Sequence, residues 1–284
     1  MEHAVTAQGR KVAAHWSRLA VTYEGALAAL AKAGIDATAV RPEDLHAIDM
    51  LHMGGLSATD ALAEQAEIGP GLRVLDVGAG VGGPARRFAD RYGATVTAVE
   101  LSETLADTAE RLTHLVGLSP NVKVLNGSAL ALPVEDASHD VVVMQHVAMQ
   151  IAEKERLFGE LARALAPGGR LALHEIFAGE GELHWPLPWA TEPTMSALEP
   201  LDAAISRLNG LGLTSGPFVD ESRAGRRYHE DIIDRWGSAA DAGQSADGLA
   251  PEVLEQRVAA SRAMENNLRD GSLKVGRLIA TRPN

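Results

Sequence analysis

Cysteine is absent from this chain of 284 residues. The absence excludes disulfides, thiolate nucleophiles, and zinc or iron–sulfur sites that depend on cysteine ligands. Long apolar runs are missing as well, since no stretch approaches the roughly 18 consecutive apolar residues of a membrane span. The N-terminal MEHAVTAQGRKVAAHW lacks a basic start followed by an apolar block, so no secretory signal is expected. We therefore expect a cytoplasmic protein with no membrane partner.

Positive charge is scarce. The chain has 26 Lys and Arg but 38 Asp and Glu, which gives a formal net charge of −12. An acidic chain without a basic stripe is a poor candidate for binding nucleic acid or an anionic membrane surface. The ten histidines include no H-x-x-x-H pair, and no carboxylate cluster suggests a metal site. A small molecule is the expected partner, and no metal is expected.

The middle of the chain alternates short apolar runs with amphipathic stretches, which is the pattern of βαβ units. The apolar runs predict five strands, over 72–77, 94–101, 121–126, 139–146 and 170–177. The stretches between them predict helices, over 82–92, from an N-cap at Ser102 to 116, and over 153–165. This alternation predicts a parallel sheet that helices cover on both faces.

The two ends of the chain have a different pattern. Helical periodicity predicts helices over 10–34, 58–66 and 198–211. Two further strands are expected over 213–222 and 272–282, and a charged helical stretch with a Gly/Ala/Ser loop at 237–249 lies between them.

A glycine-rich turn joins the first of these strands to the helix after it. Gly78, Gly80 and Gly83 of VLDVGAGVGG fit G-x-G-x-x-G, which alone is weak evidence for a dinucleotide site. Asp76 lies two residues before Gly78, where a carboxylate would repel a pyrophosphate but suits a ligand that carries an ammonium. Glu100 ends the next strand, where a carboxylate accepts ribose hydroxyls of NAD and of S-adenosylmethionine (SAM) alike. The turn follows about 77 residues that include a helical segment, which favours methyl transfer over hydride transfer.

From roughly Tyr23 to Phe218, and again at the last strand, the sequence resembles the class I SAM-dependent methyltransferases. It is most similar to the small-molecule branch that includes sarcosine/dimethylglycine N-methyltransferases and quinone-biosynthesis methyltransferases. The blocks that carry the resemblance are VLDVGAGVGGPARRFA (74–89), VTAVELS (96–102), NGSALALPVEDASHDVV (126–142), QHVAMQI (145–151) and LARALAPGGRLALHE (161–175).

The resemblance implies a Rossmann-like α/β fold with a seven-stranded, mostly parallel sheet whose last strand is antiparallel. It implies three parts. Residues 1–66 form an N-terminal helical lid segment, 67–222 with 271–284 form the SAM-binding core, and 223–270 form a helical insertion over the substrate site.

The resemblance also assigns cofactor contacts. The residues expected at SAM are Asp76 near the methionine ammonium, Gly78, Ala79 and Gly80 in the turn, Glu100 at the ribose, Leu101 at the adenine, and Ser128, Ala129 and Leu130. Relatives usually have Asp-Ala where this chain has Ser128-Ala129, so a hydroxyl or a backbone N–H replaces the carboxylate at the adenine amino group. Gln145 and His146 end the fourth strand, where sulfonium and acceptor are expected to meet.

Residues of the lid and of the acceptor pocket are less specific. His52 in HMGG (52–55) either closes over the methionine end or belongs to an ordinary loop, and Tyr23 is either a lid residue or core. Trp185 and Trp189 of HWPLPWA (184–190) border the substrate pocket or pin a surface loop. Tyr228 is assigned to the pocket as well.

Methyl transfer aligns an acceptor lone pair with the S–CH₃ bond, and a hydroxyl or carbon acceptor needs a base where a neutral amine does not. The first candidate base is His146, followed by His174, His184 and Tyr228. N-methylation is slightly favoured over O- or C-methylation in natural-product biosynthesis. The alternatives are an inactive SAM-binding scaffold and a nicotinamide dehydrogenase. Dimerisation through the N-terminal or inserted helices is left open.

Overall fold

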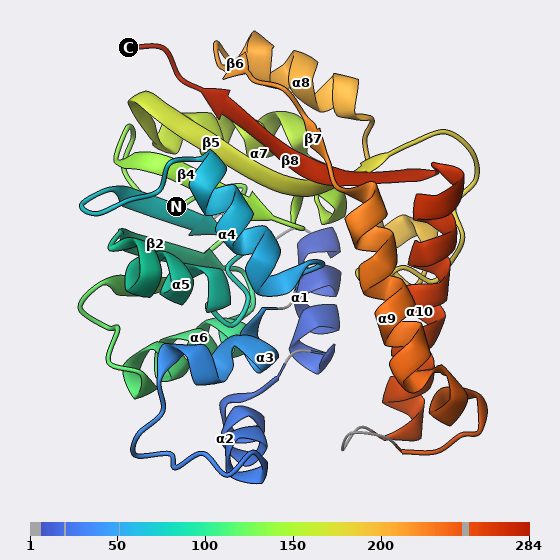
Figure 1. Ribbon diagram of the computed structural model, residues 1–284. Helices are drawn as coiled ribbons and strands as arrows, with labels where there is room; N and C mark the ends of the chain where they lie inside the picture. The colour runs from blue at the N-terminus through green and yellow to red at the C-terminus, as the bar shows by residue number, and fades with distance from the viewer. Residues whose placement is uncertain (1–6, 20, 51, 246–249) are drawn as a thin grey trace.

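A mixed sheet runs through the molecule, which the computed structural model describes for residues 7–19, 21–50, 52–245 and 250–284 (Figure 1). Its strands lie in the order β3-β2-β1-β4-β5-β8-β6, and β7 pairs with β8. Their bounds are β1 Arg73–Val77, β2 Thr95–Glu100, β3 Val122–Asn126, β4 His139–Gln145, β5 Leu165–Ala178, β6 Thr214–Ser215, β7 Val219–Asp220 and β8 Leu273–Thr281. Strands β1 to β5 pair in parallel, and β8 is antiparallel to its neighbours. The expected α/β fold with an antiparallel last strand is confirmed.

The sheet has eight strands where the sequence predicted seven, because the strand expected over 213–222 is interrupted. Its two pieces, β6 and β7, both pair with β8. Gly216 and Pro217 lie between them. Proline has no N–H to donate to the ladder, so the pairing breaks at this point.

Helices cover both faces of the sheet, as the alternation of the strands predicts. Helices α4 (Gly55–Gln65) and α5 (Gly83–Tyr92) pack on one face, against strand residues that include Val74, Val96 and Val141. Helices α7 (Lys154–Ala164) and α8 (Leu201–Gly210) pack on the other, against Leu75, Val142 and Leu171. Helix α6 (Glu103–Leu115) begins after Ser102, whose Oγ accepts a hydrogen bond from the Leu105 amide at 3.3 Å, so the expected N-cap is confirmed.

The N-terminal segment is divided into short helices. The single helix expected over 10–34 is wrong, because α1 (Ala7–Leu19) and α2 (Tyr23–Lys32) are separate. Thr22 has extended backbone and its hydroxyl accepts from the Gly25 amide at 3.1 Å, so it caps a new helix. A 3₁₀ turn (Pro42–Leu45) and α3 (His46–Asp49) then lead toward α4.

Two long helices precede the last strand. Helices α9 (Ser222–Asp241) and α10 (Pro251–Asp270) pack against each other and stand beside α1 at one end of the sheet (Figure 1). Helix α9 continues to Asp241, so the loop expected from 237 begins later. Short 3₁₀ turns lie at Ala148–Gln150 and Pro193–Met195. None of the described helices is long and apolar enough to cross a membrane.

Candidate active site

A cavity of about 1160 Å³ lies at the carboxyl ends of β1, β2 and β4. Open parallel sheets bind their ligands at this edge. The strand ends, the lid helices α1 and α2, and helices α9 and α10 form its walls. A pocket for one drug-sized ligand measures roughly 300–1,000 Å³, so this cavity has room for a cofactor and an acceptor together.

Most residues that the sequence singled out line this cavity. They are His52, Asp76, Gly78, Ala79, Gly80, Glu100, Leu101, Ser128, Ala129, Leu130, Gln145, His146, Trp189 and Tyr228. Four others, Tyr23, His174, His184 and Trp185, are not part of its wall.

The glycine turn after β1 brings bare backbone to the cavity. Gly78 has φ of +75° and Gly80 has φ of +57°, both in the left-handed region that favours glycine. A Cβ on Gly78 would overlap the side chain of Val147. The amides of Gly78 and Ala79 donate to the Val99 carbonyl at 2.8 and 3.1 Å, which fixes the turn against β2. A ligand can therefore approach the turn closely.

Asp76, at the end of β1, is a buried carboxyl with an unpartnered oxygen. The residue is 2% exposed, and Oδ2 has no hydrogen-bond partner among the described residues. Burial and the neighbouring Glu100 carboxylate raise the pKa of Asp76 to about 7, although the Ala85 amide and Arg86 oppose the shift. A cationic group beside Oδ2 would restore the charged form. The ammonium of SAM fits this need.

Glu100, at the end of β2, already supports the glycine turn. Its Oε2 accepts from the Gly80 amide at 2.9 Å and its Oε1 accepts from the Ser102 amide at 2.8 Å. Burial raises the pKa of Glu100, while these amides oppose the rise. Each carboxylate oxygen accepts more than one hydrogen bond, so the same side chain can hold the turn and accept ribose hydroxyls.

The segment after β3 brings one polar side chain to the cavity wall. Ser128 Oγ accepts from the Leu130 amide at 3.2 Å. The hydroxyl proton is then left to donate to a ligand. Leu101 and Leu130 line the same part of the wall and supply apolar surface. These residues fit a purine that is packed between apolar side chains.

His146 follows β4 in a strained conformation. Its φ is +56°, and the left-handed region costs a non-glycine residue about 1–2 kcal/mol. The His146 amide donates to the His174 carbonyl at 2.9 Å. The next two amides, of Val147 and Ala148, donate to the Glu175 carboxylate at 2.9–3.2 Å. The surrounding structure thus holds His146 in this conformation, as is common at functional sites.

Three imidazole rings lie close together at the end of β4. The His146 ring centroid lies 4.7 Å from that of His174 and 5.9 Å from that of His52. Burial lowers the pKa of His52 to about 4 and that of His174 to about 3. Burial, and then the neighbouring histidines, hold the pKa of His146 well below its usual value. All three rings are therefore neutral at pH 7.

Unpartnered polar atoms gather around the cavity. Besides Asp76 Oδ2, the Nε2 atoms of Gln145, His146 and His229 are buried without a hydrogen-bond partner in the described structure. Buried polar groups are nearly always satisfied in native proteins, so each such atom calls for an explanation. A polar ligand in the cavity is the simplest one.

One part of the cavity wall is an apolar cluster. Leu187, Trp189, Met264 and Tyr228 line it and belong to one buried cluster. Trp189 is 1% exposed and its Nε1 donates to Ser196 Oγ at 3.2 Å, so its ring is fixed. Burial raises the pKa of Tyr228, so this phenol stays protonated and is a poor base at neutral pH.

Helix α1 contacts other parts of the cavity wall through side chains that the sequence did not predict. Trp16 Nε1 donates to Gln150 Oε1 at 2.5 Å, and His15 Nε2 lies 2.9 Å from the Pro188 carbonyl. Trp16 and Gln150 both line the cavity. In the sequence, Trp16 indicates only helical periodicity, and no local signal marks Gln150 as its partner.

A buried ion pair joins the lid segment to the helix after the glycine turn. Arg86 Nη2 donates to Asp49 Oδ2 at 2.8 Å, and both side chains are 2% exposed. A Cβ on Gly83 would overlap the Asp49 carbonyl, so the segments pack with no space between them. Breaking such a pair leaves an uncompensated buried charge. Neither residue could be singled out from the sequence, because the partners lie 37 positions apart.

The four predicted residues outside the cavity wall have other surroundings. Tyr23 packs beneath Arg111, whose Cζ lies 3.8 Å from the ring centroid. His184 Nε2 lies 2.8 Å from Asp270 Oδ2 near the surface. Trp185 packs in the apolar cluster behind the wall, and His174 lies behind His146.

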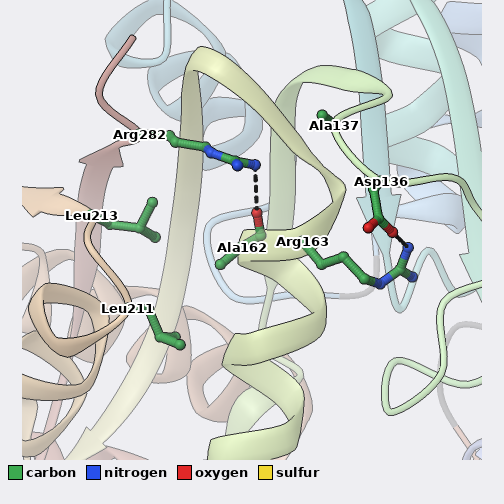
Figure 2. A pocket seen from close by; sticks show the side chains of 7 residues that line it. All are labelled: Asp136, Ala137, Ala162, Arg163, Leu211, Leu213 and Arg282. Atoms are coloured by element: carbon green, nitrogen blue, oxygen red, sulfur yellow. Dashed lines mark hydrogen bonds and ion pairs between the residues drawn. The ribbon is translucent and has the colours of Figure 1, made fainter.

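A smaller hollow of about 310 Å³ lies between the α7–β5 turn and the end of β8 (Figure 2). Arg163 donates there to Asp136 at 2.7 Å and to Glu160 at 2.8 Å. Arg282 donates to the carbonyls of Ala162 and Leu165. Both guanidinium groups bind the chain itself, so we assign this hollow a structural role. Elsewhere in the described residues, no group of three or more His, Asp or Glu side chains could hold a metal ion.

Comparison with known families and proteins supports this picture. The family described as "Methyltransferase domain" matches residues 75–173. The methyltransferase GfsG of Streptomyces halstedii is 35% identical over 47% of this chain and 48% of its own length. The glycine/sarcosine/dimethylglycine N-methyltransferase of Actinopolyspora halophila is 34% identical over 42% of this chain and 21% of its own. This chain thus aligns with half or less of the length of these curated relatives.

A solved structure shares the fold over nearly the whole chain. The geranyl diphosphate C-methyltransferase of Streptomyces coelicolor A3(2) superposes with a TM-score of 0.70 over 99% of this chain and 100% of its own. The two sequences are 19% identical, so the likeness shows the fold. The resemblance recognised in the sequence is confirmed.

Proposed function

We propose that this chain, which carries a class I SAM-dependent methyltransferase domain, transfers the methyl group of SAM to a small-molecule acceptor. The buried, unpartnered carboxyl of Asp76 beside the glycine turn carries the proposal. This carboxyl would repel a ligand pyrophosphate, whereas a ligand ammonium would pair with it.

Each part of the cavity has a role in this proposal. Bound SAM supplies an electrophilic methyl group on a positively charged sulfur. Asp76 pairs with the ammonium, Glu100 accepts the ribose hydroxyls, and the Ser128 segment packs on the adenine. The lid contact between Trp16 and Gln150 then excludes water.

The acceptor is proposed to be an apolar small molecule that is methylated on oxygen or carbon. The apolar wall around Trp189 and Met264 suits such a molecule, and the neutral imidazole of His146 can take its proton. Sequence resemblance slightly favoured N-methylation. A neutral amine needs no base, so the histidine cluster supports the alternative of an O- or C-methyltransferase of natural-product biosynthesis.

Calorimetric titration with S-adenosylhomocysteine (SAH) tests the cofactor part, with NADH as the competing ligand. We expect saturable SAH binding, which Asp76→Asn weakens about 30-fold because a buried charge loses its partner, a cost of about 2 kcal/mol. The matched control is Asp90→Asn on the exposed side of α5, which should bind like the wild type. Binding of NADH but not of SAH would contradict the proposal.

Transfer from methyl-labelled SAM to a naphthol, a 1,3-diketone and a secondary amine tests the acceptor class. We expect product from the oxygen or carbon acceptor. His146→Asn should reduce its rate by about 10²–10⁴-fold with SAH affinity retained. Asparagine is chosen because it also tolerates the left-handed backbone at this position.

Transfer to the amine alone, with no effect of His146→Asn, would show N-methylation. Tight SAH binding without product from any acceptor would favour an inactive SAM-binding scaffold.

A further inference from the structure

A row of polar side chains leads from His146 away from the cavity to the edge of the sheet. His174 of β5 is 2% exposed, and its Nε2 lies 3.4 Å from Oε2 of Glu221, the residue before α9. Glu221 Oε1 accepts from Arg277 Nε at 3.1 Å, and Arg277 also donates to the Ala61 carbonyl at 2.6 Å. The Glu221 side chain is 22% exposed, whereas its Oε2 is buried and has no hydrogen-bond partner among the described residues.

The roles of the ring nitrogens of His146 and His174 follow from which of them lack a hydrogen-bond partner. His146 Nε2 and His174 Nδ1 are both buried and have no hydrogen-bond partner in the described structure. The ring centroids are 4.7 Å apart, so the two rings are in contact. His146 Nδ1 is then the nitrogen left for the cavity, and His174 Nε2 is the one that faces Glu221.

We propose that Glu221 and His174 are positioning residues that hold His146 as the tautomer protonated at Nε2, with Nδ1 free to take a proton from the acceptor. Glu221 accepts from His174 Nε2–H, so His174 Nδ1 is unprotonated and accepts from His146 Nε2–H. This inference rests on the proposed function, because it gives the histidine pair a role in acceptor deprotonation.

The same row carries the proton out of the site. When His146 Nδ1 takes the acceptor proton, its Nε2 proton passes to His174 Nδ1, and the His174 Nε2 proton passes to Glu221. The acceptor forms its bond to the methyl carbon as the S–CH₃ bond breaks, and Glu221 releases one proton to water. After the product has left, His146 Nδ1 gives its proton to water in the cavity, and a proton taken up at Glu221 returns along the row, which restores the Nε2–H form of both rings. Burial disfavours an imidazolium at either ring, so a base at this position needs such an exit.

The other groups that face this row have different connections. His52 faces both rings, but its Nε2 lies 3.1 Å from the Gly55 carbonyl and 3.0 Å from Thr59 Oγ1, which fixes its tautomer locally. His229 faces His146, and its Nδ1 lies 3.2 Å from Ser261 Oγ. Arg277 faces His174 and forms an ion pair with Glu221. Of these groups, Glu221 alone brings a carboxylate to His174.

Nitrogen-15 NMR of histidine-labelled protein tests the tautomers without any acceptor, in the free protein and with SAH. We expect both His146 and His174 to be protonated at Nε2. Glu221→Gln should convert His174, and with it His146, to a tautomer mixture, because an amide donates as well as accepts. Glu221→Asp should restore the single form, and Glu230→Gln on the surface of α9 is the matched control.

Kinetics with the acceptor that the labelled-SAM assay identifies give the second readout. Glu221→Gln should lower kcat about 10- to 100-fold and shift its pH profile, with KM and SAH affinity within about two-fold of the wild type. Glu230→Gln should change none of these quantities. Tautomers and kcat that are the same in Glu221→Gln and Glu230→Gln would overturn the relay.

The two proposals fail in different ways. Absence of SAH binding refutes the proposed function, whereas the tautomers of the free protein decide the arrangement of His146, His174 and Glu221 by themselves. Normal SAH binding with unchanged tautomers refutes the relay alone.

Discussion

The two halves of the cavity are built by different means. On the proposed cofactor side, consecutive strand ends and one turn line the cavity, through Asp76, Gly78 and Glu100. On the acceptor side, side chains from α1, the 184–190 loop, α9 and α10 meet only in the folded chain. The cofactor side is therefore encoded locally, and the acceptor side depends on tertiary packing.

The halves also differ in what they leave unsatisfied. The proposed cofactor side holds the buried, unpartnered carboxyl of Asp76. The proposed acceptor side combines the apolar cluster around Trp189 with His146 and His229, whose Nε2 atoms have no partner among the described residues. Substitutions on the acceptor side should therefore change stability and acceptor choice while SAH affinity is retained. Substitutions at the turn should remove SAH binding.

The largest expected effect is on the acceptor side. Trp189→Ala should lower the free energy of unfolding by about 3–5 kcal/mol, because the ring is almost fully buried. Urea unfolding measures the loss. Trp185→Ala, which removes a partly buried ring behind the wall, should cost less. If Trp189→Ala weakened SAH binding as strongly as Asp76→Asn does, the two halves would not be separable.

Substitution in the glycine turn, unlike Trp189→Ala, should remove SAH binding. Gly78→Ala should abolish measurable SAH binding and cost about 3 kcal/mol of stability, from the left-handed backbone and from overlap with Val147. Gly34→Ala is the control, because Gly34 has φ of +76° with no atom near its Cβ position. It should cost only about 1–2 kcal/mol. Equal losses would show that the overlap is relieved by movement of Val147.

Acidic pH should destabilise the folded chain through the buried ring of His52. His52 has a pKa of about 4 in the folded chain and about 6.5 when unfolded. The unfolded chain therefore takes up the proton first as pH falls. The contribution of the neutral His52 ring to the free energy of unfolding is complete above pH 6.5. It falls by about 1.4 kcal/mol per pH unit as the pH decreases from 6.5 toward 4.

His52→Asn should reduce the slope of unfolding free energy against pH by this amount between pH 6.5 and 4.5. Asp76 and Glu175, whose pKa values are raised to about 7, act in the opposite direction in both proteins and cancel in the comparison. His114→Asn, at an exposed position of α6, is the control and should leave the slope unchanged. An unchanged slope in His52→Asn would contradict the burial of this ring.

The smallest expected effect is at the lid, where both halves meet. Trp16→Phe keeps an aromatic ring but removes the hydrogen bond to Gln150. Such a bond contributes about 1 kcal/mol to the stability of the closed contact. We expect SAH to dissociate about five-fold faster in stopped-flow measurements, with little change in Tm. No change in the dissociation rate would show that α1 does not retain the cofactor.

The residues proposed for the cofactor side could be placed at one edge of the sheet from the sequence, for a physical reason. Strand ends and glycine turns follow from local patterns, so the positions of Asp76, Glu100 and His146 at one edge could be inferred. The breaks at Thr22 and at Gly216-Pro217 depend on single capping and turn residues that helical or strand periodicity conceals.

The acceptor side could not be derived in this way. Trp16 meets Gln150, and His174 meets Glu221, across 134 and 47 positions of the chain. Asp49 and Arg86 likewise form a pair that no local pattern indicates. Such contacts arise when helices pack at the end of the sheet, and charge or periodicity along the sequence does not specify them.

Proton release on SAH binding tests most directly the claim that Asp76 is the partner of the cofactor ammonium. The free carboxyl has a pKa of about 7, and an adjacent ammonium lowers it. SAH titrations at pH 7 in two buffers of different ionisation enthalpy should therefore show release of about half a proton, which Asp76→Asn abolishes. Binding without proton release, or the same release from Asp76→Asn, would contradict the account.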